Sequence, residues 1–388
     1  MDPSVLMAGP RGRRLLLQFA LGADDERGTL HQRVREADLL FDPDSPRASL
    51  SAVYEPMLAD RLRRLGTYLP LPAPARRTRT AEPAPGDART AARRASDALG
   101  AVPLASVAWE TLGTALADAV ALARYWQPPD GTDVLLARDE MCEALARVAA
   151  HIAASEAASW WTSFVDVSSQ HAMLWDGQDP VPPVDSARTP LLDARRHLEE
   201  QETRGGKERR AGGISGEWWS APSWPVTVPR SARLGPDGSP IAALLVEDSL
   251  GWEEGESIEL AVPEGLRIFE IGSADAWAEL CGRFPIDVSA QKRSDWRNTT
   301  GREGAWVMPD WAAVAEHYDA VHLTVAAYLA IAGRAIPVSD EASSVVAGWD
   351  PDATYWFTDR VRYTGEREQW VERVDLDRYA WERAEPLT

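Results

Sequence analysis

Residues 203–216, TRGGKERRAGGISG, separate two parts of the chain that differ in their pattern of apolar residues. Two Gly-Gly pairs, at 205–206 and 212–213, flank a charged run that offers little apolar surface to a core. Glycine pairs of this kind mark loops between regular elements. The stretch therefore predicts a linker at 204–215, with a different class of structure on each side of it.

The part of the chain before this linker has a helical pattern. Apolar residues recur there three and four positions apart, which is the spacing of one face of an α-helix. The pattern is seen in residues 91–126, 137–161 and 190–202. We expect an N-terminal segment at 1–68 and a helical domain at 95–203. Between them, residues 69–94 are rich in Pro, Ala and Arg without an apolar period, which predicts a disordered linker.

The part after the linker is rich in tryptophan and has a strand-like pattern. It holds 12 of the 17 tryptophans, and its apolar residues fall in short runs with β-branched and aromatic side chains. The runs are residues 224–228, 241–248, 257–262, 266–271, 305–308, 319–324 and 353–357. Short helices are expected after Ser273 and Asp310, which are suitable N-caps. The fold class is thus α+β: a mainly helical N-terminal part, and a Trp-rich mixed α+β domain at 216–388 that we expect to be catalytic.

Composition restricts the partners and the compartment. The formal net charge of −19 argues against nucleic acid or an anionic membrane as the main partner, because phosphate groups require a basic surface. The two cysteines, Cys142 and Cys281, make no disulfide framework and favour a reducing compartment, so we expect a cytoplasmic protein. The apolar run at 15–23, LLLQFALGA, is too short to span a membrane and predicts a first helix or a buried strand. The expected partner is a small-molecule ligand, with a protein acceptor as a further candidate.

Residues 257–271, SIELAVPEGLRIFEI, read as a strand, a turn through Pro263 and Gly265, and a second strand. Upstream, residues 216–234 carry an aromatic-serine pair and an arginine before another strand-like run. Together these stretches resemble the late strands and the serine-containing strand of the ADP-ribosyltransferase fold. The resemblance implies an enzyme that holds NAD in a cleft and transfers or hydrolyses its ADP-ribose group.

The same resemblance implies roles for individual residues. Glu270 becomes the carboxylate that steadies the ribosyl cation, with Glu259 as the other candidate. Arg230 becomes a phosphate partner, and Trp219 and Ser220 become lining residues of the NAD site. NAD is then the substrate. No metal is expected, since the sequence lacks a Walker A motif, His-Glu-x-x-His and paired Cys-x-x-Cys.

Residues 316–333, EHYDAVHLTVAAYLAIAG, contain Asp319-x-x-His322. The alternation of a strand would put Val321 and Leu323 on one face and His322 on the other, beside Ala320. A histidine on a polar strand face can act as a base or orient a pyrophosphate, with Asp319 holding its ring. The alternative is that the two residues form a structural pair with no part in chemistry.

Two other functions remain open. Residues 244–252, LLVEDSLGW, followed by Asp-x-x-His, resemble the nucleophile and last blocks of SGNH (GDSL-type) hydrolases, which implies a serine hydrolase using Ser249, Asp319 and His322. The density of tryptophans also fits a non-enzymatic ligand-binding module with a Trp-rich cleft. Asp350 and Asp352, in GWDPDATYWF (348–357), fit plain turn chemistry and less readily a cation site.

Overall fold

The computed structural model describes residues 1–24, 28–42, 84–175, 177–182, 188–207, 217–222, 228–248, 252–375 and 378–384. The protein is α+β, as the sequence predicts. The helices before residue 208 are α1 (Ser4–Ala8), α2 (Pro10–Leu21), α3 (Thr29–Phe41), α5 (Pro85–Ala101), α6 (Trp109–Ala121), α7 (Gly131–Leu136), η1 (Asp139–Met141), α8 (Cys142–Ala153), η2 (Glu156–Thr162) and α9 (Arg188–Lys207). The later helices are α10 (Ile241–Leu244), α11 (Ala274–Arg283), α12 (Ser289–Thr300), α13 (Trp311–His317) and α14 (Val325–Ile331).

The strands form three four-stranded sheets, named here A, B and C. Sheet A is antiparallel and joins β1 (His171–Trp175), β3 (Glu254–Ala261), β11 (Arg362–Asp375) and β12 (Arg378–Arg383), in that order. Sheet B has the order β2 (Arg230–Ser231), β10 (Thr354–Trp356), β7 (Ala320–Leu323), β4 (Ile268–Ile271), and its β7–β4 pair is parallel. Sheet C has the order β5 (Pro285–Asp287), β6 (Ala305–Pro309), β9 (Ala342–Ser344), β8 (Ile336–Pro337).

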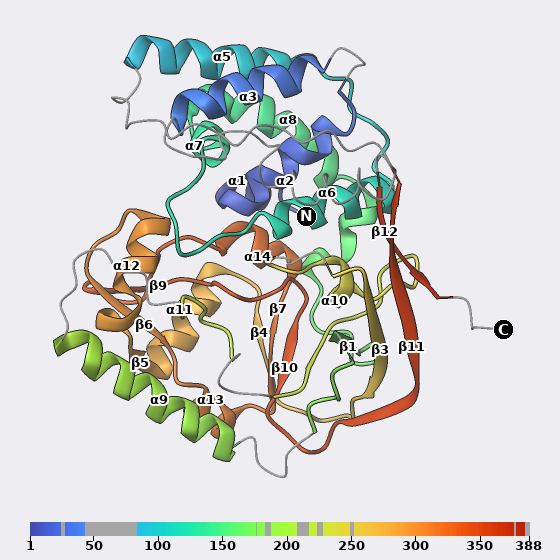
Figure 1. Cartoon of the computed structure of the whole chain (residues 1–388), viewed down its shortest axis with the longest axis vertical. Helices are drawn as coiled ribbons and strands as arrows, with labels where there is room; N and C mark the ends of the chain where they lie inside the picture. Colours follow the sequence, from blue (N-terminus) through green and yellow to red (C-terminus); the bar gives the residue numbers. More distant parts are fainter. Residues whose placement is uncertain are drawn as a thin grey trace.

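The N-terminal helices lie as a layer over α14, at the top of the molecule in Figure 1. The approach is close: a Cβ on Gly9 would lie 2.3 Å from the carbonyl oxygen of Leu329, so only glycine fits there. Buried residues of both parts, such as Leu16 in α2 and Trp349 before β10, belong to one hydrophobic core. The helical layer and sheet B are therefore packed against a shared core, and the division into separate domains stays a prediction.

Several local predictions are confirmed. The apolar run at 15–23 lies mostly within α2. Ser273 caps α11 by accepting a hydrogen bond from the N–H of Ala276, and Asp310 caps α13 in the same way. The strand expected at 241–248 is wrong, because its first four residues form α10. Pro240 opens that turn of helix, and the alanines that follow are strong helix formers.

The predicted linkers are only partly within the described residues. Of the linker at 69–94, the structure describes residues 84–94, and these belong mainly to α5, whose alanines at positions 88, 92 and 95 pack inward. Of the linker at 204–215, it describes the last residues of α9. The strand expected at 224–228 also lies almost wholly outside the described residues. One strand, β1, comes from the range expected to be helical, and it pairs with β3.

Candidate functional site

Sheet B carries a row of polar side chains across its four strands. Strand pairing sets Ser231 opposite Thr354, Thr354 opposite His322, and His322 opposite Glu270. Residues paired in this way point to the same face of a sheet, so the four side chains form one row. Val321 points the other way, into the main core, as the alternating pattern of the sequence predicts.

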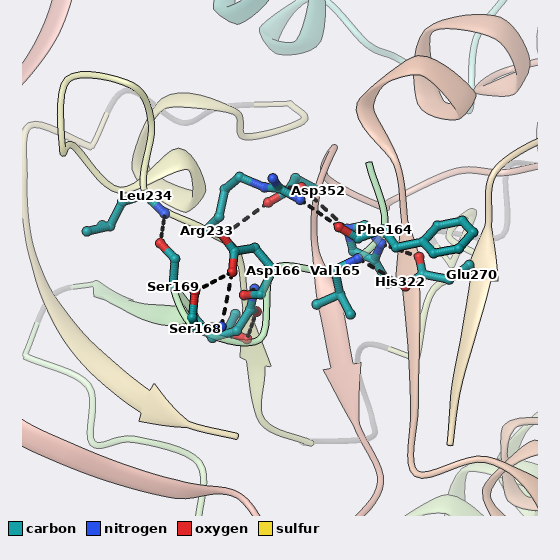
Figure 2. Close-up of polar contacts among 12 residues, drawn as sticks. Phe164, Val165, Asp166, Ser168, Ser169, Arg233, Leu234, Glu270, His322 and Asp352 are labelled. Carbon is teal, nitrogen blue, oxygen red and sulfur yellow. Dashed lines mark hydrogen bonds and ion pairs between the residues drawn. The ribbon is translucent and has the colours of Figure 1, made fainter. Parts of the chain in front are cut away.

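His322 is the centre of this row and is almost completely buried, with 1% of its side chain exposed. Its Nδ1 lies 2.6 Å from Oε2 of Glu270, and its Nε2 lies 3.4 Å from Oδ1 of Asp352 (Figure 2). Carboxylates only accept hydrogen bonds, so both contacts are satisfied when both ring nitrogens carry protons, as in an imidazolium. Burial by itself lowers the pKa of His322, but the hydrogen bonds and charges of Asp352 and Glu270 outweigh it and raise that pKa above its usual value.

Asp352 connects the histidine to an arginine. Arg233 donates from Nε to Oδ1 of Asp352 at 2.9 Å and from its backbone N–H to Oδ2 at 3.0 Å. Asp352 has a positive φ of 60°, a conformation that aspartate tolerates better than most residues. Its own N–H donates to the carbonyl oxygen of Leu323 at 2.9 Å, which fixes the turn against β7. The turn before β10 thus holds a carboxylate between two cations.

The network closes on itself through one peptide group. Nη2 of Arg233 donates to the carbonyl oxygen of Phe164 at 2.9 Å, and the N–H of Val165 donates to Oε1 of Glu270 at 3.0 Å. That carbonyl and that N–H belong to the same peptide bond. The result is a ring of hydrogen bonds that runs from the peptide through the arginine, the aspartate, the histidine and Glu270 back to the peptide, visible in Figure 2. We call it the charged ring.

The peptide belongs to a strap, residues 163–169, that follows η2 and has contacts from Glu270 in edge strand β4 to Leu234, just after β2 at the opposite edge of sheet B. The strap is anchored at both ends. The guanidinium of Arg233 lies 5.1 Å from the ring centroid of Trp160, just before the strap. At the far end, the N–H of Leu234 donates to Oγ of Ser169 at 3.1 Å (Figure 2). The charged ring is therefore braced by the main chain as well as by side chains.

Charge and exposure distinguish Glu270 from the other members of the ring. Two carboxylates face two cations, so the ring is balanced when His322 is protonated. The side chain of Asp352 is 2% exposed, whereas 15% of the Glu270 side chain reaches solvent from the edge strand β4. Each carboxylate oxygen has a second lone pair, so Glu270 can still accept a hydrogen bond or face a positive charge. Glu270 is the member of the ring best placed to meet a ligand.

The surroundings of His322 change the role that the sequence suggests for it. A general base needs a nitrogen within hydrogen-bond reach of the proton that it removes. Both nitrogens of His322 face carboxylates, and the ring is buried. The arrangement instead suits a residue that orients Glu270 and counters its charge.

Asp319 does not hold the ring of His322. Its Oδ2 accepts the backbone N–H of Arg267 at 2.7 Å, and its Oδ1 pairs with the guanidinium of the same residue at 3.3 Å. Residues three apart along a strand point to opposite faces, which keeps the aspartate away from the histidine. The expected Asp-x-x-His pair is not formed, so the contact between Asp319 and His322 that the serine hydrolase interpretation requires is missing. Ser249, its expected nucleophile, lies outside the described residues.

Arg230 lies on the face of sheet B opposite His322. In the strand register it lies opposite Tyr355, one residue before Ser231 of the polar row, so its side chain points to the other face. Its Nη1 donates to Oδ2 of Asp350 at 2.6 Å, and 32% of its side chain is exposed. The structure therefore does not bring the expected phosphate partner together with Glu270.

The other two expected cofactor residues support the main chain near residue 347. Ser220 is fully buried, and its Oγ accepts the N–H of Ala347 at 3.1 Å. Trp219 lies against Gly348, where a Cβ would come within 2.4 Å of the tryptophan Cβ. Lys292 lies 5.8 Å from the centroid of the Trp219 ring. These are packing contacts of a buried serine and a half-buried tryptophan.

Sequence reasoning missed Arg233 and Asp352. The signal was present as two matching patterns: PRSAR places arginines at 230 and 233, and WDPDA places aspartates at 350 and 352. Each arginine pairs with one aspartate, Arg230 with Asp350 and Arg233 with Asp352. The aspartates look like turn residues when they are taken alone, and only the pairing identifies them as network residues.

Within the described ranges, no group of three or more His, Cys, Asp or Glu side chains is arranged to hold a metal ion. In the same ranges, no helix is both long and apolar enough to cross a membrane. Both cysteines are free; Cys142 is exposed and Cys281 is buried.

Comparison with known proteins gives no match to a protein-family model, to a curated protein sequence or to a solved structure. The chemistry of the charged ring is therefore the basis on which a function can be argued.

Proposed function

We propose that the protein cleaves the N-glycosidic bond of NAD, and transfers the ADP-ribose group to an acceptor or to water, with Glu270 as the catalytic carboxylate. One observation carries the proposal: both oxygens of Glu270 are held, by the N–H of Val165 and by His322, while part of the side chain still reaches solvent. A carboxylate oriented in advance costs little reorganisation when positive charge develops next to it.

The reaction needs such a group. As the bond between the anomeric carbon and the pyridinium nitrogen breaks, its electron pair leaves with the nitrogen and neutral nicotinamide departs. The ribose then carries oxocarbenium-like positive charge, which a carboxylate stabilises, as in glycoside cleavage. Water or an acceptor group adds to the anomeric carbon and releases a proton. Glu270 supplies the negative charge and can accept a hydrogen bond from a ribose hydroxyl.

The other members of the ring act through Glu270. His322 counters its charge and fixes its orientation, while Asp352 and Arg233 hold the imidazolium in place. This assignment replaces the base role for His322 and leaves Asp319, Arg230, Trp219 and Ser220 outside the reacting group. Because both cysteines are free, we place the activity in the cytoplasm.

The test is incubation of the full chain with NAD, with free nicotinamide measured by chromatography and melting temperature measured in parallel. A ligand at 100 times its dissociation constant stabilises its protein by about 2.7 kcal/mol, which gives a visible shift. Nicotinamide release supports the proposal. A melting shift without release contradicts it and identifies a binding module. The absence of both nicotinamide release and a melting shift also contradicts the proposal. Cleavage of p-nitrophenyl esters that depends on Ser249 would put a serine hydrolase in its place.

A further inference from the structure

A second buried polar cluster lies on the opposite side of sheet B, where the N-terminal helices meet the α+β part. Its centre is Glu247, in the loop after α10, which is 9% exposed. The N–H of Glu247 donates to Oδ1 of Asp350 at 2.8 Å, and Oε2 of Glu247 accepts the N–H of Trp349 at 3.0 Å. The two acidic residues are thus locked side by side by the main chain.

Two tyrosines join the cluster from different layers of the molecule. Tyr125 follows α6 in the helical layer, and Tyr328 lies in α14 beneath it; their hydroxyl oxygens are 3.3 Å apart. Both tyrosines act electrostatically on Glu247, and among the described residues Oε1 of Glu247 is buried without a hydrogen-bond partner. The ring of Tyr125 packs on Gly333, where a Cβ would lie 2.6 Å from it. The carboxyl of Glu247 therefore sits at the contact between the two layers.

The charges around Glu247 do not balance if both carboxyl groups are ionised. The titratable groups that face it are Asp350, Tyr355, Tyr125 and Tyr328. The cations on the surrounding elements are Arg230, Arg11 and Arg124, and Arg124 pairs with Asp248 at 3.0 Å. Arg230 is committed to Asp350, with 2.6 Å between Nη1 and Oδ2. Arg11 forms an ion pair with Asp133 and donates a hydrogen bond to the carbonyl oxygen of Ala119. A buried carboxylate without its own cation is costly, and such a group takes up a proton instead.

We propose that Glu247 is a proton-binding site that makes the packing of the N-terminal helical layer on the α+β part depend on pH: the packed state holds Glu247 protonated, and ionisation at alkaline pH weakens the packing. The inference does not rest on the proposed NAD chemistry. Burial, and next the charge of Asp350, raise the pKa of Glu247 to about 8.

The sign of the effect follows from linkage. An unfolded glutamate has a pKa of 4.5, so between that value and about 8 the folded protein binds more protons at Glu247 than the unfolded chain does. Stability falls with rising pH wherever the folded state holds more protons. The contribution of Glu247 is therefore complete below pH 4.5, is lost as pH rises toward about 8, and stays lost above that.

The experiment compares the melting temperature of the full chain with that of Glu247→Gln from about pH 5.5 to about pH 9. Glutamine resembles a protonated glutamate and cannot ionise, so the variant should lose much less melting temperature across this range and should exceed the wild type at the alkaline end. Glu264→Gln makes the same change at an exposed position and should follow the wild type. A Glu247→Gln variant with the wild-type pH slope would overturn the inference.

A second measurement uses the wild type alone, and so does not depend on the folding of the variant. Infrared difference spectra should show the carbonyl stretch of a buried protonated carboxyl group at about pH 6, and this band should disappear with a midpoint near the pKa of about 8. If no protonated carboxyl band is present at about pH 6, Glu247 is ionised in the packed state and the inference fails.

Discussion

The charged ring and the Glu247 cluster lie on opposite faces of one sheet, and their buried carboxyl groups are neutralised in different ways. In the ring, two carboxylates meet two cations, and the extra proton rests on His322. In the cluster, the arginine Arg230 pairs with Asp350, Glu247 has no cation of its own among the described residues, and the extra proton rests on Glu247. The same turn supplies Asp352 to the ring and Asp350 to the cluster.

The difference indicates which network can carry chemistry. The ring ends at a carboxylate that is oriented and partly exposed, whereas the carboxyl of Glu247 is buried under two tyrosines and neutral near pH 7. An ionised carboxylate can stabilise a developing cation, and a protonated one cannot. The ring is therefore the candidate for reaction, and the cluster is the candidate for control of packing.

Breaking the ring should give the largest loss of stability. Asp352→Ala leaves the buried Arg233 without its carboxylate and His322 with one partner fewer, which should cost about 3–5 kcal/mol of unfolding free energy. The matched control is Asp319→Ala, the partner expected from sequence, whose arginine is 58% exposed. That change should cost about 1 kcal/mol or less. Urea denaturation measures both, and equal losses would show that the ring is no more than a surface ion pair.

A smaller effect is expected in the pH dependence of the ring. Because the pKa of His322 is raised, its charge stabilises the fold fully below 6.5, the usual value, and this contribution is lost as pH rises through the raised pKa. The stability difference between the wild type and His322→Gln should therefore shrink from about pH 6 to about pH 9. Glu247 titrates in both proteins and cancels from the difference. A difference that grows with pH would mean that the histidine is neutral in the fold.

The sequence predicted the parts of the site that depend on local pattern. Alternation along 319–324 placed His322 on a polar face, and the run LRIFEI predicted the strand that carries Glu270. Pairing across the sheet could not be predicted in this way. Glu270 and His322 meet because β4 and β7 are parallel neighbours, and the order of strands in a sheet is set by contacts between distant segments.

Long-range contacts also explain the residues that were missed or misplaced. Asp319 is close to His322 in sequence but points to the other side of the strand, whereas Asp352 is 30 residues away and reaches the ring through a turn with positive φ. The strap contributes only backbone atoms to the charged ring, and backbone groups leave no signature in a sequence. The ion pair of Arg230 could not be predicted because its partner, Asp350, lies 120 positions further along the chain.

The most direct test of the account comes from one matched pair of substitutions, Glu270→Gln and Glu247→Gln. Each replaces a carboxyl group with an amide of the same size, one in each network. Glutamine at 270 keeps one acceptor oxygen for the two donors, His322 and the N–H of Val165, so Glu270→Gln should cost about 1.5–3 kcal/mol of stability. The measurement is the rate of nicotinamide release from NAD by the wild type and both variants at about pH 7. The account predicts a loss of at least about 100-fold in Glu270→Gln and a rate within about twofold of the wild type in Glu247→Gln. Release that survives in Glu270→Gln, or that is lost in Glu247→Gln while the fold is intact, would contradict the assignment of the chemistry to the charged ring.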